Sequence, residues 1–407
     1  MSLWLLVALS GKPLAAADAP GEWRGFLGGC GNVALGAKLP VKWSVETGEN
    51  IAWTAELPGR GVSSPIVVAG RVIVTCSSGE PDGPEENLHV LAFGEASGER
   101  LWQRDFKAKG RTKINEATAV AGSTPVTDGE RVYCLFSSND LVAVDLEGEI
   151  LWELGLAKTH PQAGNDFGMA SSPVMAGKRV IVQCDGSEAA FVAGVDPASG
   201  EIAWERERKA GGSWSTPLVI PWQFGGKAVE AVMFQAAEGI EALDAATGEL
   251  LWKEELPCET IPSPIVVDRR LYVAAKSLVA LEREGAGEEW AVSWKGAGIK
   301  PSAATPVVHE GWAYGVGRGG LLSAAKVGSD EVSWKLRLGG TVWATPLLAD
   351  GRLYCVNGDG AAFVVELGDE GRVSYETSFG EPILASPAVS GDAMFVRGHK
   401  HLWKIAE

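Results

Sequence analysis

Five basic side chains within ten positions are the residues whose type and spacing best suit a binding site. The chain as a whole is acidic, with a formal net charge of −16, so this segment locally reverses the sign. A positive patch of this kind attracts an anionic partner and makes the association rate depend on salt. We therefore expect the segment to contact an acidic ligand, a polyanionic glycan or a partner protein. Its basic residues are Arg104, Lys107, Lys109, Arg111 and Lys113.

Two further groups of residues extend this candidate site. The segment 157–169, AKTHPQAGNDFGM, is expected on the same face and supplies His160, Asn165 and Asp166. If the basic segment is only a solubilising loop, we expect the site at the mouth of a central channel, near Trp214 and Trp343. Both segments fall in unusually long connections. Long loops are usually functional or disordered, although loops also accept insertions easily.

Residues for nucleophilic or metal-assisted catalysis are not evident from motifs. The sequence contains no G-x-S-x-G and no H-E-x-x-H. The run HKH at 399–401 places two imidazoles on one face of a strand, but two ligands do not make a zinc site. We interpret His399 and His401 as solvated surface, and we predict no catalytic residue and no metal ligand.

A repeated pattern determines where all these residues lie. A Ser-Pro or Thr-Pro followed by an apolar run recurs every 40 to 60 residues, at Pro65, Pro125, Pro173, Pro217, Pro264, Pro306, Pro346 and Pro387. An aromatic residue precedes each proline, in five units by 12 residues: Trp53, Trp102, Trp152, Trp204, Trp252, Trp294, Trp334 and Tyr375. A period of 20–50 residues indicates a solenoid, a propeller or an array.

One repeat unit reads as four short strands. In residues 124–152 the dipeptide DG separates two apolar runs and marks a hairpin. Gly148 stands where a tight turn requires a positive φ. The proline opens the first strand because it cannot donate to a sheet ladder and is tolerated only at edges or strand starts. Four strands in 40–50 residues form a propeller blade, so we predict an all-β, eight-bladed β-propeller of antiparallel blades.

The ends of the repeat predict how the ring closes. After Pro387 the chain has room for only three strands, and the missing outer strand is NIAWTAEL near the N-terminus. This strand is expected to complete the C-terminal blade, and the eight aromatic residues are expected to dock between neighbouring blades. Residues 41–407 are thus predicted to be one propeller domain, preceded by a signal peptide at 1–17 and an extended segment at 18–40.

Composition and the N-terminus point to an exported protein. The apolar run LWLLVAL followed by LAAADA resembles a signal peptide with a cleavage site after Ala17. The chain is acidic and has no basic stripe, which argues against nucleic acid as the partner. The sequence also contains no run of 18 apolar residues, so we predict no transmembrane span. We expect a monomer in the periplasm or cell envelope.

The six cysteines are not expected to form a disulfide framework. Cys76, Cys134, Cys184 and Cys355 fall at matching positions on the second strands of their blades. Equivalent positions in packed sheets are about 10 Å apart, beyond the ~7 Å Cα separation that a bridge tolerates. They are predicted to be small buried hydrophobic residues.

The repeat also carries a family resemblance. The stretch ALDAATGELLW at 242–252 resembles the tryptophan-docking repeat of pyrroloquinoline-quinone (PQQ)-type propellers, and the likeness extends from Trp43 onward. That superfamily includes quinoprotein dehydrogenases, which are enzymes, and the propeller lipoprotein of the outer-membrane β-barrel assembly machinery, which is a scaffold. The stretch EWRGFLGGCGNV before the first blade is most similar to a third set, the exported quinone-repeat-like propellers of bacteria.

The resemblance implies two functions from different classes. The quinoprotein dehydrogenases place two adjacent cysteines over the quinone and hold Ca²⁺ in an oxygen-ligand cage; no two cysteines here are neighbours, and no such cage can be placed on matching positions. We therefore expect a non-enzymatic exported propeller that binds a protein or acidic ligand, with neither PQQ nor calcium as a cofactor. A quinoprotein-type oxidoreductase is the alternative.

Overall fold

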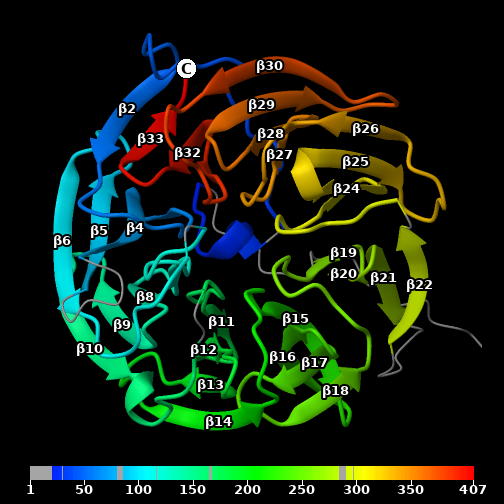
Figure 1. The fold of residues 1–407 in the computed structure, drawn as a ribbon. Coiled ribbons are helices and arrows are strands. Elements are labelled where there is room, and N and C mark those ends of the chain that lie inside the picture. The colour runs from blue at the N-terminus through cyan, green and yellow to red at the C-terminus, as the bar shows by residue number, and fades with distance from the viewer. Residues whose placement is uncertain are drawn as a thin grey trace, which may run out of the picture.

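Eight sheets stand radially around a central axis and form a closed ring (Figure 1). They belong to a computed structural model that describes residues 21–29, 31–79, 86–115, 117–164, 167–283, 290–296 and 298–407. Each sheet contains four antiparallel strands, which follow chain order in seven sheets; in the eighth the outer strand comes from the N-terminal segment. One sheet gains a fifth, parallel strand. The predicted eight-bladed β-propeller is therefore confirmed. The predicted signal peptide lies outside the described residues.

Blades 1 to 4 follow one another along the chain. Blade 1 consists of β3 (Ile66–Val68), β4 (Arg71–Ser78), β5 (Asn87–Gly94) and β6 (Arg100–Lys107). Blade 2 consists of β7 (Val126–Thr127), β8 (Arg131–Leu135), β9 (Asp140–Asp145) and β10 (Ile150–Gly155), followed by the short helix η2 (Leu156–Lys158). Blade 3 consists of β11 (Val174–Ala176), β12 (Arg179–Cys184), β13 (Ala190–Val195) and β14 (Ile202–Arg208). Blade 4 consists of β15 (Leu218–Phe224), β16 (Lys227–Ala236), β17 (Gly239–Asp244) and β18 (Leu250–Glu254).

Blades 5 to 8 complete the ring. Blade 5 consists of β19 (Ile265–Val267), β20 (Arg270–Ala274), β21 (Leu278–Arg283) and β22 (Trp290–Gly296). Blade 6 consists of β23 (Val307–His309), β24 (Trp312–Gly317), η3 (Arg318–Gly320), β25 (Leu321–Lys326) and β26 (Trp334–Arg337). Blade 7 consists of β27 (Leu347–Ala349), β28 (Arg352–Val356), β29 (Ala361–Glu366) and β30 (Arg372–Ser378), with β1 (Val33–Ala34) added beside β27. Blade 8 consists of β31 (Ala388–Ser390), β32 (Ala393–Arg397), β33 (His401–Ile405) and β2 (Ile51–Glu56).

The position of a strand within its blade explains its sequence. The third strand β13 is buried along its whole length, because packed blades cover both of its faces. The outer strand β14 alternates between half-buried and exposed residues, as a strand with one solvated face should. The four strand cysteines of the repeat are buried and free, and Cys258 is free as well. The prediction that the four strand cysteines form no disulfides is confirmed.

The repeated tryptophans join each blade to the next. Trp204 Nε1 on β14 donates a hydrogen bond to Ala245 O in blade 4, at 3.0 Å, and its ring covers Gly248. A Cβ on Gly248 would lie 2.6 Å from that ring, and the φ of Gly248 is +75°. The position therefore requires glycine for two reasons, the close approach of the ring and the positive φ. Indoles donate to the next blade in the same way at Trp53, Trp102, Trp152, Trp294 and Trp334. Trp252 packs instead against Trp222 and Trp290.

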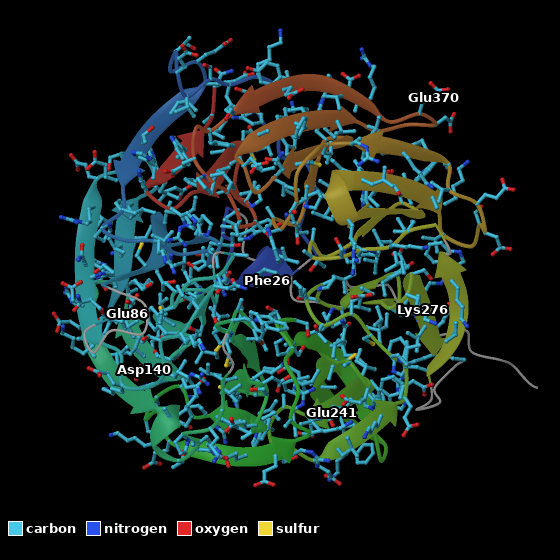
Figure 2. The ribbon with its side chains drawn as sticks, viewed as in Figure 1. Phe26, Glu86, Asp140, Glu241, Lys276 and Glu370 are labelled. Carbon is cyan, nitrogen blue, oxygen red and sulfur yellow. The ribbon has the colours of Figure 1, made fainter. Side chains whose placement is uncertain are left out.

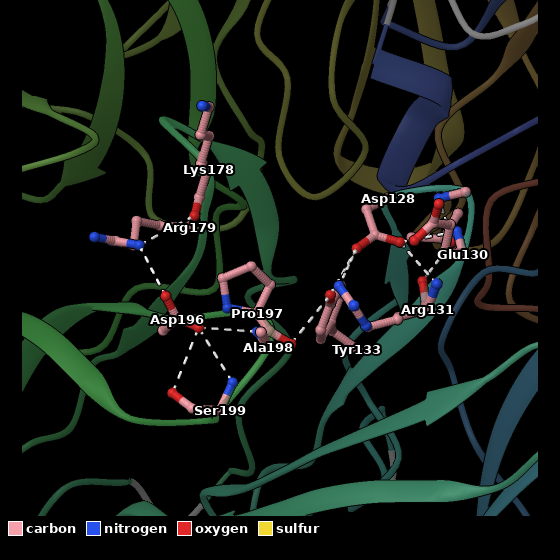
Figure 3. Close-up of polar contacts among 12 residues, drawn as sticks. Asp128, Glu130, Arg131, Tyr133, Lys178, Arg179, Asp196, Pro197, Ala198 and Ser199 are labelled. Carbon is pink, nitrogen blue, oxygen red and sulfur yellow. Dashed lines mark hydrogen bonds and ion pairs between the residues drawn. The ribbon is translucent and has the colours of Figure 1, made fainter.

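Aspartates shape the turns that receive these indoles. Figure 3 shows Asp196 accepting hydrogen bonds from the amides of Ala198 and Ser199, while its second oxygen pairs with Arg179. The Pro197 carbonyl of this turn accepts the Trp152 indole. Asp145 and Asp244 hold their own turns with the same type of contact. The docking-repeat aspartates are thus turn-forming residues.

The N-terminal strand closes the ring. β2 pairs antiparallel with β33, with Glu56 opposite His401 at one end and Ile51 opposite Ile405 at the other. Because this pairing leaves no continuous turn between the two strands, the aromatic residue of blade 7 docks elsewhere: Tyr375 Oη donates to Trp43 O at 2.7 Å. The expected closure is confirmed.

A buried arginine secures the seam between blades 8 and 1. The Arg397 guanidinium, at the end of β32, donates to the carbonyl oxygens of Ser63 and Thr75 at 3.1 and 3.0 Å. The residue is almost completely buried, and burial lowers the pKa of its guanidinium. Arg397 therefore satisfies backbone acceptors that the blade interface would otherwise leave unpaired.

The segment before the first blade lies inside the channel. Trp23 bridges to Val67 of β3, Arg24 O accepts the amide of Thr127, and Leu348 N donates to Asn32 O. Between these anchors the short helix η1 (Phe26–Gly29) lies at the centre of the ring (Figure 1). Neither composition nor the repeat pattern indicated this placement. Among the described residues, no helix has the length and apolar character needed to cross a membrane.

Candidate functional site

The Ser or Thr before each repeat proline forms a layer of hydroxyls at one mouth of the channel. This mouth is on the crossover face, defined here as the face whose loops connect one blade to the next. In seven successive steps a hydroxyl oxygen accepts the backbone amide of its counterpart in the preceding blade, at 2.9–3.1 Å, and Ser64 begins the series by donating its amide to Thr124. The residues are Ser64, Thr124, Ser172, Thr216, Ser263, Thr305, Thr345 and Ser386. The proline motif therefore links the blades as well as starting each inner strand.

The residue two positions before each hydroxyl forms a second layer around the same mouth. Its members differ widely in size: Val62, Gly122, Ala170, Trp214, Ile261, Ala303, Trp343 and Leu384. Together the two layers surround a cavity of about 270 Å³. Small residues in blades 2, 3 and 6 leave space that the two tryptophans border. The mouth consequently has a shape that the eightfold backbone alone would not give it.

Aromatic side chains build much of the cavity wall. Trp214 is fixed by a hydrogen bond from its Nε1 to Gly168 O at 2.7 Å. Phe167 meets it edge-on, with ring centroids 6.3 Å apart and an interplanar angle of 69°. The Phe167 side chain is 53 % exposed, which is unusual for a phenylalanine. Phe26, labelled at the centre of the ring in Figure 2, also lines the cavity.

The part of the cavity lining that the structure describes is uncharged. The described residues that line it include aromatic rings, aliphatic groups, hydroxyls and the Asn115 amide, and no Asp, Glu, Lys, Arg or His. Each hydroxyl that accepts an amide still has its own O–H to donate. The mouth therefore suits an apolar or aromatic group bordered by hydrogen-bond acceptors.

The opposite mouth has a different character. A cavity of about 420 Å³ lies on the other side of η1 and includes Arg24, Asp128 and Glu230 in its lining. Phe26 lines this cavity as well. Asp128 accepts a hydrogen bond from Tyr133 Oη at 2.7 Å, and amides of its own turn bind its other oxygen (Figure 3). Burial opposes the ionised form, but these hydrogen bonds lower the pKa of Asp128.

The predicted basic segment does not present five equivalent side chains. Arg104 lies within β6, where its Nε donates to Gly148 O and its guanidinium covers the Trp102 ring. Lys109 forms an ion pair with Glu153. Lys107 and Arg111 are exposed and Lys113 is half-buried. Arg104 and Lys109 thus contact blade 2, Lys107 is the last residue of β6, and the loop that carries Arg111 and Lys113 continues to Asn115 at the mouth.

The remaining predicted residues lie in separate places. His160 pairs with Glu205 at 2.9 Å and stacks on Phe191, so it packs against blade 3 instead of the mouth. Asn165 and Asp166 lie outside the described residues. Trp214 and Trp343, by contrast, line the same cavity.

The HKH run also differs from its interpretation as solvated surface. His401, the first residue of β33, contacts Glu381 at 3.3 Å. His399 lies before that strand and is half-buried; burial and the nearby Arg397 charge lower its pKa. The solvated-surface interpretation does not hold for His399, which is half-buried at the seam between blades 8 and 1, whereas the His401 side chain is 36 % exposed beside Glu381. Within the described ranges, no three His, Cys, Asp or Glu residues are grouped to hold a metal ion.

Sequence reasoning missed the hydroxyl layer and the roles of Phe26 and Phe167. The signal for the layer was present, because Ser or Thr precedes proline in all eight units. No sequence signal places Phe26 in the channel, since that depends on contacts with blades far along the chain.

Comparisons with known proteins agree with this architecture. The profile of a family described as outer membrane protein assembly factor BamB matches residues 24–191, 118–218, 188–286 and 275–369. BamB from Moraxella catarrhalis is similar in structure, with a TM-score of 0.63 and 17% identity over 87% of this chain and 96% of that chain. A europium-containing methanol dehydrogenase has a TM-score of 0.58 and 11% identity over 96% and 99%. Quinohemoprotein alcohol dehydrogenase from Comamonas testosteroni has a TM-score of 0.52 and 12% identity over 96% and 81%. A search of curated proteins gives no significant match.

Proposed function

Because this chain belongs to the family described as outer membrane protein assembly factor BamB, we propose that it is an exported propeller that acts as a binding scaffold in the cell envelope and does not catalyse quinoprotein-type oxidation. The family name supports a role in holding another protein. The fold is consistent with that role but does not decide it, because related propellers include enzymes.

The observation that carries the proposal is the aromatic mouth on the crossover face, whose described lining residues are uncharged. Its partner is a polypeptide segment that inserts an aromatic or aliphatic side chain between Trp214 and Trp343. Aromatic side chains supply large contact area and are enriched where proteins bind one another. The loop after β6 connects this mouth to Arg111 and Lys113, so the segment is expected to carry acidic residues beside its apolar anchor.

The hydrogen-bond donors and cations at the mouth support the quinoprotein alternative less well than they support peptide binding. PQQ carries three carboxylate groups, and burying them requires cations or several convergent donors. The described residues lining the mouth provide hydroxyls and one amide but no Lys or Arg. These residues do not fit that cofactor.

A photo-crosslinking experiment tests the proposal. A benzophenone amino acid replaces Phe167 at the mouth, and in a matched control it replaces Leu101, which is 49 % exposed on the outer strand of blade 1. We expect crosslinks in cells to one envelope protein from position 167 only, at a segment with an apolar anchor and neighbouring acidic residues. Combining Trp214→Ala with Trp343→Ala should abolish them.

Two results would contradict the proposal. Equal crosslinking from positions 167 and 101 would mean that the mouth is not the docking site. Calcium-dependent binding of PQQ at micromolar concentration, measured by calorimetry, would favour the oxidoreductase alternative instead.

A further inference from the structure

Three polar side chains in blade 1 form a continuous hydrogen-bonded chain away from the channel mouth. Ser78 Oγ lies 2.7 Å from His89 Nε2, and His89 Nδ1 lies 2.6 Å from Asp105 Oδ1. A hydroxyl on one ring nitrogen and a carboxylate on the other is the arrangement of a serine nucleophile, its base and the group that orients the base.

Strand register brings the three residues together. His89 on β5 stands directly opposite Cys76 on β4 and directly opposite Asp105 on β6. Ser78 lies two residues beyond Cys76, so its side chain is on the same face of the sheet and diagonal to His89. No motif reveals the triad, because its members come from three strands and are separated by 11 and 16 residues.

Burial and hydrogen bonding define the state of the histidine. The His89 side chain is 8 % exposed, whereas that of Asp105 is 60 % exposed. Burial opposes ionisation of Asp105, but hydrogen bonds from Gln103 and His89 lower the pKa of this carboxyl. An ionised carboxylate only accepts hydrogen bonds, so Nδ1 carries a proton and donates it to Asp105, which leaves Nε2 as the ring nitrogen that faces Ser78 Oγ.

Ser78 lies at the end of β4, where the strand becomes partly exposed. Ser78 is the last residue of that strand and is half-buried, and Gly79 after it is exposed with φ +123°. On the other side, the Arg60 amide donates to Ser77 O at 3.0 Å. The candidate nucleophile therefore lies at a partly exposed strand end that is hydrogen-bonded to the segment at Arg60.

We propose that Ser78, His89 and Asp105 form an acyl-transfer site for small carboxylic esters, with Ser78 as the nucleophile, His89 as the general base and Asp105 as a positioning residue. Ser78 Oγ bonds to the ester carbon and the ester C–O bond breaks. The Ser78 proton passes through His89 Nε2 to the departing alcohol. Water then hydrolyses the acyl-serine by the reverse proton path. This activity is separate from partner binding at the mouth.

The test uses a fluorophosphonate probe on the purified full-length chain. Ser78 Oγ bonds to phosphorus, fluoride leaves, and the proton departs through His89, so mass spectrometry should find the adduct on Ser78. General-base assistance contributes about 10²–10⁴-fold, so His89→Gln should slow labelling by at least about 100-fold. Ser78→Ala should abolish it. Ser293→Ala is the matched control, because the Ser293 hydroxyl donates only to Ala280 O within blade 5 and has no histidine beside it.

The Asp105→Asn variant distinguishes an effect on the labelling reaction from an effect on folding. The exposed carboxyl can be replaced without disturbing the fold, but the amide no longer fixes the proton on Nδ1, so labelling should fall while the thermal midpoint stays unchanged. If His89→Gln fails to fold, Ser78→Ala and Asp105→Asn still decide the question. An unlabelled parent protein, an adduct at another residue, or labelling of Ser78 at the parent rate in Asp105→Asn would overturn the proposal.

Discussion

Truncating Trp53 to alanine should destabilise the seam where the chain closes its ring. The indole lies in β2, the outer strand of blade 8, and only 9 % of the residue is exposed. Its Nε1 donates to Glu95 O in blade 1 at 3.0 Å, and its ring covers Gly98. On its other side it packs against Phe395 of β32, with centroids 5.9 Å apart. One side chain therefore contacts both blades of the seam.

The expected magnitude follows from these contacts. Replacing a buried tryptophan by alanine costs about 3–5 kcal/mol, because apolar burial is lost and a cavity remains. The indole hydrogen bond contributes only about 1 kcal/mol of this. Trp53→Phe keeps most of the apolar contact and should cost roughly 1–2 kcal/mol.

Equilibrium unfolding in urea, followed by far-ultraviolet circular dichroism, measures the effect. Trp102→Ala is the matched control, because Trp102 makes the same contact between blades 1 and 2, with its Nε1 2.9 Å from Leu146 O. Both alanine variants should lower the urea midpoint by similar amounts. The reasoning would be refuted if Trp53→Ala unfolded at the parent urea midpoint while Trp102→Ala was destabilised. That result would mean that the contact of Trp53 with blade 1 does not stabilise the closed ring.

Three further predictions concern charge. Arg397→Met should lower the free energy of unfolding by about 2–4 kcal/mol, measured by urea denaturation, because it leaves buried carbonyl oxygens unpaired. Burial, which outweighs the Arg208 ion pair, raises the pKa of Asp185 to about 6. The folded state then holds this proton to higher pH than the unfolded state does. The contribution of Asp185 to the free energy of unfolding should therefore fall by up to about 3 kcal/mol as the pH rises from about 4 to about 6. In the Asp185→Asn protein, the free energy of unfolding measured across this pH range should lose that decrease. Changing Lys107, Arg111 and Lys113 together to Glu should alter stability by no more than about 0.5 kcal/mol per site but weaken the crosslink from position 167, most strongly at low salt; unchanged crosslinking would exclude the basic loop from the interface.

Periodic features of the fold could be predicted from the sequence, because each repeats under the same physical requirement. The docking indoles and the aspartate turns recur in successive units, so an error in one unit is corrected by the others. The N-terminal strand was predictable by counting strands. In each case the argument depended on local spacing.

Features that depend on contacts between distant segments could not be predicted. Arg104 reads as a free surface charge in the sequence, but the turn of the next blade provides an acceptor for it at Gly148. His160 was expected at a binding face, but Phe191 and Glu205 of blade 3 hold it elsewhere. The alignment of Ser78 with His89 depends on strand register and side-chain rotamer, which no motif encodes.

The placement of Phe26 on the axis of the ring gives the two mouths a shared boundary, because this phenylalanine lines the cavity on either side of η1. The described linings of the two cavities differ in polarity: that of the crossover mouth is uncharged, and that of the opposite mouth contains Arg24, Asp128 and Glu230. The two ends of the axis therefore suit ligands of different polarity.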